Sequence, residues 1–123
     1  LCAEVTVNGI PAYTLFDSGC TTDSISPTLA FLTSADCIEL SEQMNLQLGA
    51  KGSRTKINHG AKARMKIGPV DEYHYFDVVD IDRYDLILGT PFFLKHNVIL
   101  DFKNRTITID GVDVPVYTRV DEA

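Results

Sequence analysis

Short alternating segments separated by glycine turns dominate this sequence and restrict its fold most strongly. Ala3, Val5 and Val7 alternate with polar residues, and Asn8-Gly9 then supplies a two-residue turn of the kind that joins antiparallel strands. Similar strand-like segments follow at 10–16, 44–49, 54–59, 61–67, 73–79, 98–102, 105–109 and 112–114, with a short apolar run at 84–88. This pattern predicts an all-β fold, either a barrel or a sandwich.

Two short helices are expected among these strands. Ser26-Pro27 and Thr90-Pro91 each place an N-cap residue before a proline, which is favoured at the first position of a helix. We therefore predict helices over 28–33 and 92–96.

The length and composition fit one modest domain. A chain of 123 residues can bury a single core, so residues 1–123 are predicted to form one domain. The chain begins without an initiator Met or a signal-peptide layout, which favours a domain excised from a longer polyprotein. No apolar run is long enough for a membrane span, so no membrane partner is expected. Cys2, Cys20 and Cys37 form no C-x-x-C pair, which favours reduced thiols and an intracellular location, cytoplasmic or nuclear.

Charge is distributed unevenly along the chain. The net charge of −6 argues against a general nucleic-acid binder. Residues 51–66 nevertheless carry 6 of the 11 basic residues and none of the 17 acidic ones. This basic segment is interpreted as a solvated hairpin, with attraction of acidic or nucleic-acid-associated polyprotein substrates as the functional alternative.

Asp17 follows the apolar residues Leu15 and Phe16 and precedes Ser18-Gly19. In the simplest interpretation, its carboxylate accepts backbone N–H bonds in an Asx-type turn. The functional interpretation is that two such carboxylates share one proton and activate a water molecule. Because the chain contains only one Asp-Ser-Gly, the second carboxylate would have to come from a second copy across a two-fold axis.

Other chemistries find less support in the sequence. Ser18 has no histidine near it in sequence and no Gly-x-Ser-x-Gly motif, and Cys20 equally lacks a neighbouring base. The acids of 80–85 lack the glycine and the closing glutamate of a calcium loop. His59, His74 and His96 do not have zinc-ligand spacing. No metal and no cofactor are therefore expected.

Two blocks together resemble the retropepsin family, the homodimeric aspartic proteases of retroviruses and LTR retrotransposons. The first is Asp17-Ser18-Gly19 with its preceding hairpin and the strand at 24–26. The second, "YDLILGTPFFLKHNVILDF", looks like the hydrophobic-hydrophobic-glycine motif and C-terminal helix of the gypsy-type branch. The resemblance spans roughly residues 2–110 and implies an acid-protease barrel with a flap hairpin and one or two short helices.

The resemblance also implies a role for each matching residue. Asp17 would be the catalytic carboxylate, one per subunit, and the loop braced across the dimer axis would contain Ser18 and Gly19. Substrate would be contacted by Gly19, Thr21, Thr22 and Ile25, and by the flap residues Lys51, Gly52 and Ser53. The residues supporting the Asp17 loop would be Ile87, Leu88 and Gly89.

The expected function is that of an aspartic endopeptidase acting as a homodimer. It would cleave extended peptide segments, its own polyprotein being the expected substrate, with water activated between two Asp17 carboxylates. The alternative is a domesticated or monomeric domain that binds peptide or assembles protein without cleaving. The sequence leaves this alternative open.

Overall fold

The computed structural model describes the backbone of residues 1–48 and 53–118, and the side chains of these residues except 38–58. Strands and two short helices follow one another along the described chain. The strands are β1 (Cys2–Val7), β2 (Ile10–Phe16), β3 (Ser24–Ile25), β4 (Asp36–Leu48), β5 (Ser53–Ile67), β6 (Val70–Val78), β7 (Leu86–Leu88), β8 (Val98–Asp101), β9 (Thr106–Ile109) and β10 (Val112–Val114). The helices are α1 (Pro27–Leu32) and α2 (Thr90–Lys95).

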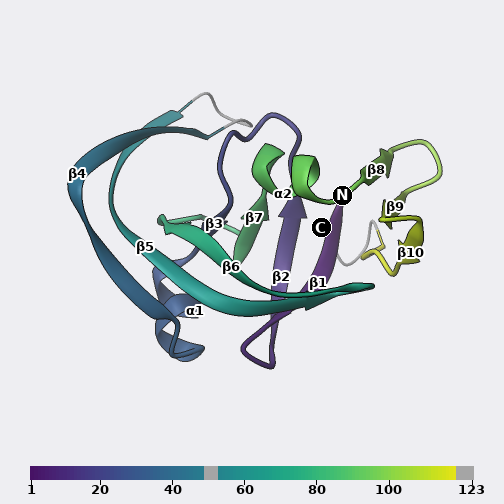
Figure 1. Cartoon of the computed structure of the whole chain (residues 1–123). Helices are drawn as coiled ribbons and strands as arrows, with labels where there is room; N and C mark the ends of the chain where they lie inside the picture. Colours follow the sequence, from purple (N-terminus) through teal and green to yellow (C-terminus); the bar gives the residue numbers. More distant parts are fainter. Residues whose placement is uncertain (49–52, 119–123) are drawn as a thin grey trace.

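Six of the strands close into a barrel. They are hydrogen-bonded in the order β1-β2-β7-β3-β6-β5, and the pairs Thr6↔Lys66 and Val7↔Met65 join β5 back to β1. Strand β4 continues the sheet beyond β5. Strands β8, β9 and β10 form a separate three-stranded sheet, which lies on the opposite side of the molecule from β4 (Figure 1). The prediction of an all-β barrel is confirmed.

The barrel interior is apolar, and its strands alternate as the sequence predicts. On β5, Ala61, Ala63 and Met65 are buried, whereas the basic residue that follows each of them is exposed. One contiguous core is formed by side chains from the barrel strands and both helices: Val5, Val7, Phe16, Ile25, Leu29, Met65, Phe76, Leu86, Leu88 and Phe92. The described part of the basic segment, Lys62, Arg64 and Lys66, therefore lies on the outer face of the barrel.

Two hairpin turns have the backbone conformation that their sequences favour. Asn8 and Gly9 have φ values of 47° and 82°, and Asp110 and Gly111 have values of 48° and 82°. Asparagine, aspartate and glycine tolerate this left-handed region better than other residues, so these dipeptides set the strand registers on either side. The Asn8-Gly9 turn pairs Val7 with Ile10 and so aligns the whole of β1 with β2.

Strand β5 is longer than expected, because Gly60 does not interrupt it. Gly60 pairs with Ile38 on β4 and with Asp77 on β6, and the Tyr75 ring occupies the space where a Cβ would stand. The two strands predicted at 54–59 and 61–67 are thus one continuous element. Strand β4 also begins before the predicted start at residue 44, and its pairing with β5 is irregular between Glu39 and Met44.

The two helices begin differently. Ser26 caps α1 as predicted, because its Oγ accepts the Leu29 N–H at 3.1 Å. The prediction that Thr90 caps the second helix is wrong: α2 already includes Thr90, and Gly89 is its N-cap without a side-chain hydrogen bond. The cause is backbone geometry, since the helical bonds already start with Phe93 N–H donating to the Gly89 carbonyl at 3.1 Å. Of the helices described, neither is long and apolar enough to span a bilayer.

Candidate active site

Asp17 lies directly beyond the end of β2, beside β7. The two strands are parallel, with Phe16 opposite Leu88, and the Asp17 N–H donates to the Leu88 carbonyl at 3.0 Å. The Asp17 carbonyl in turn accepts the Cys20 N–H at 3.1 Å. The backbone of Asp17 is therefore fixed on one side by a core strand and on the other by its own turn.

The Asp17 side chain takes part in that turn. Its Oδ1 accepts the Gly19 N–H at 2.9 Å, which is the Asx-type hydrogen bond of the simplest interpretation. Asp17 is half-buried in the single chain, whereas Ser18 and Gly19 are exposed. The turn thus orients the carboxylate at the surface, where a second molecule can approach it.

The Ile87-Leu88-Gly89 segment packs against this loop. Leu88 belongs to the main core, and Ile87 belongs to a smaller cluster that also contains Cys20. A Cβ on Gly89 would lie 2.7 Å from the Thr22 carbonyl oxygen and closer still to that of Cys20. Glycine is therefore required here for the close approach of two backbones.

The remaining predicted site residues lie in different environments. Thr21 is exposed, and the Oγ1 of the half-buried Thr22 lies 3.3 Å from Ser24 Oγ. Ile25, expected beside a substrate pocket, is fully buried in the core. Lys51 and Gly52 lie outside the described residues, and only the backbone of Ser53, the first residue of β5, is described. Ser53 pairs with Leu48, so β4 and β5 run antiparallel as the expected hairpin requires, although both strands are longer than expected.

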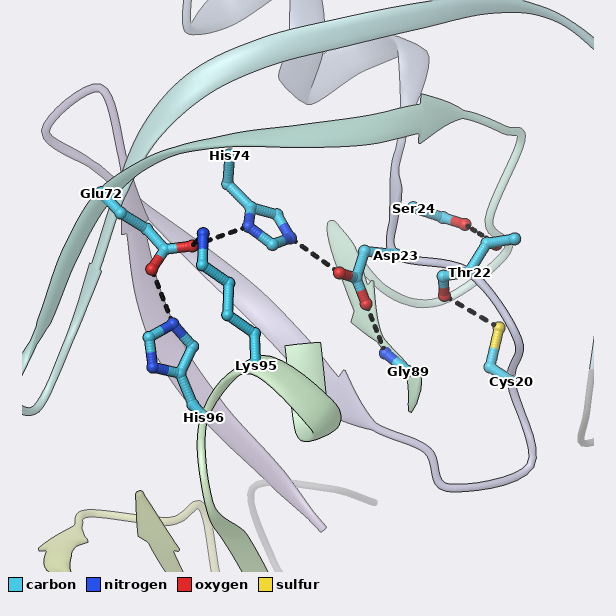
Figure 2. A network of polar contacts seen from close by, with 9 residues as sticks. All are labelled: Cys20, Thr22, Asp23, Ser24, Glu72, His74, Gly89, Lys95 and His96. Carbon is cyan, nitrogen blue, oxygen red and sulfur yellow. Dashed lines mark hydrogen bonds and ion pairs between the residues drawn. The ribbon is translucent and has the colours of Figure 1, made fainter. Parts of the chain in front are cut away.

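A polar network that was not predicted from the sequence lies beside the loop, with its inner part buried (Figure 2). At its inner end, Asp23 Oδ1 accepts the Gly89 N–H at 2.8 Å, while its Oδ2 lies 2.7 Å from His74 Nε2. The other ring nitrogen of His74, Nδ1, lies 2.9 Å from Glu72 Oε2. His74 thus bridges two carboxylates, one of which holds the backbone of Gly89.

The network continues from Glu72 to the surface. Glu72 Oε1 lies 2.6 Å from His96 Nε2, and Lys95 Nζ lies 3.0 Å from Glu72 Oε2. His96 Nδ1 lies 2.9 Å from Asp110 Oδ2 in the hairpin turn that follows β9. These contacts connect β6, α2 and the three-stranded sheet through side chains.

The network shifts the pKa values of its members. Burial opposes ionisation of Glu72, yet hydrogen bonds from Lys95, His74 and His96 outweigh it and lower the Glu72 pKa to about 2. Burial likewise acts to lower the pKa of His74, but its hydrogen bonds to Asp23 and Glu72 prevail and raise that pKa above its usual value. Both shifts favour the charged forms of these groups.

One sequence signal could have located this network. Val70 and Phe76 are buried on β6, and residues at even spacing from them share the same face of the strand. Glu72 and His74 occupy that face and are mostly buried, while the tyrosines between them are exposed. Polar residues at core positions of a strand are informative because burial is costly unless they find partners. Over the residues whose side chains are described, no three His, Cys, Asp or Glu groups are placed to hold a metal ion.

Comparison with known proteins decides the family. The family described as the PEG10/RTL1 protease domain matches residues 13–114, a range that includes both Asp17 and Gly89. The chain belongs to this family. Its fold is also that of a solved structure, the retroviral protease-like domain of Ddi1 from Leishmania major, with a TM-score of 0.71. The two share 19% identity over 98% of this chain and 92% of the other, so this second likeness concerns the fold. The expected retropepsin-like fold is confirmed.

Proposed function

We propose that this protease-family domain is an aspartic endopeptidase that acts as a homodimer. The observation that carries the proposal is the single Asp17-Ser18-Gly19 turn, which is fixed to β7 through Leu88 and leaves Asp17 half-buried and its two neighbours exposed. A two-fold axis through this surface would bring two Asp17 carboxylates together from two identical chains.

The chemistry follows from two carboxylates that share one proton. One Asp17 would take a proton from the water that attacks the scissile carbonyl, and the other would donate its proton to the carbonyl oxygen. The leaving amine would then be protonated within the same pair. Since two adjacent carboxylates do not both ionise readily, we expect the best rate on the acidic side of neutral pH.

The substrate would bind in an extended conformation between the active-site loops and the β4–β5 hairpins. A flap closing over such a peptide adds main-chain hydrogen bonds, in effect an extra strand. The proposed contacts are Gly19, Thr21 and Thr22 from the loop region and Lys51, Gly52 and Ser53 from the hairpin. Ile25, which is fully buried in the core, would support a side-chain pocket without touching the peptide. Ser18 and Gly19 would brace the two loops across the axis, and Ile87, Leu88 and Gly89 would support them. The proposed substrate is the polyprotein that contains the domain.

A peptide-library cleavage assay between pH 4 and 7 tests the proposal with a matched pair of variants. Asp17→Asn removes one carboxylate at the proposed site while keeping its size. Asp113→Asn makes the same change at an exposed position on β10, in the separate sheet. We expect cleavage by the wild type and by Asp113→Asn, inhibition by statine-type transition-state mimics, and at least about a thousandfold loss in Asp17→Asn, as is usual when a catalytic group is removed.

Two results would contradict the proposal. Cleavage that survives in Asp17→Asn would exclude the carboxylate mechanism. Peptide binding without cleavage in the wild type would instead favour the alternative, a domesticated domain that binds or assembles protein.

A further inference from the structure

Asp23 is a nearly fully buried carboxylate just downstream of the candidate catalytic loop. Its side chain is 3% exposed, and both oxygens are engaged, one by the Gly89 N–H and the other by His74. A buried carboxylate is costly unless it is paired and hydrogen-bonded, so Asp23 depends on these two partners. Of the two, His74 is the one whose charge can change near neutral pH.

His74 lies between two acids, and this restricts its protonation state. Its Nε2 faces Asp23 and its Nδ1 faces Glu72, at 2.7 and 2.9 Å. A neutral imidazole has one N–H donor, whereas an imidazolium has two. Both short contacts can therefore be hydrogen bonds to ionised carboxylates only when His74 carries its second proton.

We infer that His74, in its protonated form, is a positioning residue that clamps Asp23 onto the Gly89 amide and thereby holds the loop that carries Asp17. The catalytic consequence of this inference rests on the proposed function. The hydrogen-bonded arrangement of His74, Asp23 and the Gly89 amide, called the clamp below, can be tested without any activity. His74 acts through Asp23 and is not proposed to touch the substrate.

The clamp reaches the catalytic loop through Gly89. The residue before it, Leu88, accepts the Asp17 N–H, and the residue after it, Thr90, donates to the Cys20 carbonyl at 3.0 Å. Gly89 itself packs against the carbonyls of Cys20 and Thr22. A displacement of Gly89 would thus move backbone contacts at Asp17 itself and at Cys20 and Thr22, which is why the Gly89 amide reports on the loop.

The pH dependence follows from the groups around His74. Acids and bases from three parts of the fold face His74 directly or through one partner. Asp23 comes from the loop before β3, Glu72 and Asp77 come from β6, and Lys95 and His96 come from α2 and its C-cap. Asp110 joins them through His96. Because the paired acids raise the His74 pKa, the clamp is complete below the ordinary histidine pKa near 6.5 and is lost as pH rises through the raised value.

Hydrogen exchange at the Gly89 amide, measured by NMR from pH 5.5 to 9 and corrected for the intrinsic rate, tests this inference. The imidazole resonances of His74 report its titration in the same samples. In the wild type we expect Gly89 protection to fall about tenfold as His74 loses its proton, the change expected when a hydrogen bond to a charged group is weakened. In His74→Gln, protection should be low throughout and show no step.

His96→Gln is the matched control, because it removes the imidazole on the other side of Glu72 and leaves the contact between Asp23 and His74 in place. We expect this variant to keep the step at Gly89. Wild-type protection that stays unchanged across the His74 titration would overturn the inference, as would a step that persists in His74→Gln. If His74→Gln fails to fold, the wild type and His96→Gln still decide. An inactive chain would leave this result standing, so failure of the clamp and failure of the protease proposal are distinguishable.

Discussion

At the scale of single residues, the Asp17 side chain forms the local turn of the simplest interpretation, and the shared-proton pair of the functional interpretation stays a proposal. Asp17 Oδ1 accepts the Gly19 N–H in a local turn, and the same turn orients the carboxylate at the end of a core strand. The sequence predicted the carboxylate and its position after an apolar strand. It did not predict that the single chain would leave Asp17 half-buried, because exposure depends on how β7 and the loop at 20–22 pack beside it.

Gly89 gives a prediction at this scale. Gly89→Ala should destabilise the fold by about 1–3 kcal/mol, as over-packing does, because its new Cβ would meet two backbone carbonyls that cannot easily move. Gly60→Ala is the comparison: there a Cβ meets the ring of Tyr75, which is 39% exposed and can turn outward. Urea denaturation of both variants measures the difference. If Gly89→Ala lowers the free energy of unfolding by no more than Gly60→Ala does, the close approach of Gly89 to Cys20 and Thr22 does not require glycine.

At the scale of elements, the turns were more predictable than the faces of the strands. Asn8-Gly9, Asp110-Gly111 and the Ser26 cap are local signals, and each has the expected geometry. The orientation of β6 is different, because the face that carries Val70 and Phe76 also carries the polar Glu72 and His74. That face points inward, whereas the tyrosines on the other face are 55% and 39% exposed. That choice depends on partners from the loop before β3 and from α2, which lie far away in sequence.

The contact between β6 and α2 predicts a pH dependence of stability. The Glu72 pKa of about 2 lies below its ordinary value of 4.5, so the stabilisation is fully present above pH 4.5 and is lost as pH falls toward 2. Glu72→Gln should therefore lower the free energy of unfolding by about 1–2 kcal/mol at pH 6, the contribution expected for hydrogen bonds to a charged group that is largely shielded from solvent. The difference from wild type should shrink toward pH 2.

Urea denaturation at several pH values checks this prediction. Glu4→Gln, at an exposed position on β1, provides the control and should stay close to wild type at each pH. Glu72→Gln could instead lower the free energy of unfolding by the same amount at pH 6 and at pH 2.5. That result would mean that the carboxylate charge is not the source of the stabilisation.

At the scale of the whole molecule, the sequence predicted the class of fold and left the closure undecided. Alternation and turns favoured either a barrel or a sandwich, and the family resemblance favoured the barrel. What closes the barrel is the pairing of Thr6 and Val7 with Lys66 and Met65. This register joins segments about sixty residues apart and has no local sequence signal. The same limit applies to the proposed dimer, whose contacts depend on surfaces from several elements.

The central claim, that one active site needs two copies of Asp17, is tested most directly by mixing chains. Inactive Asp17→Asn chains are added in equal amount to wild type, at a concentration where dimers dominate, and subunit exchange is allowed to reach equilibrium. Random pairing leaves about half of the wild-type chains with a wild-type partner, so peptide cleavage should fall to about half. Addition of Asp113→Asn should not lower it. Cleavage that is unaffected by Asp17→Asn chains would contradict the account, because it would mean that a single chain carries the complete site.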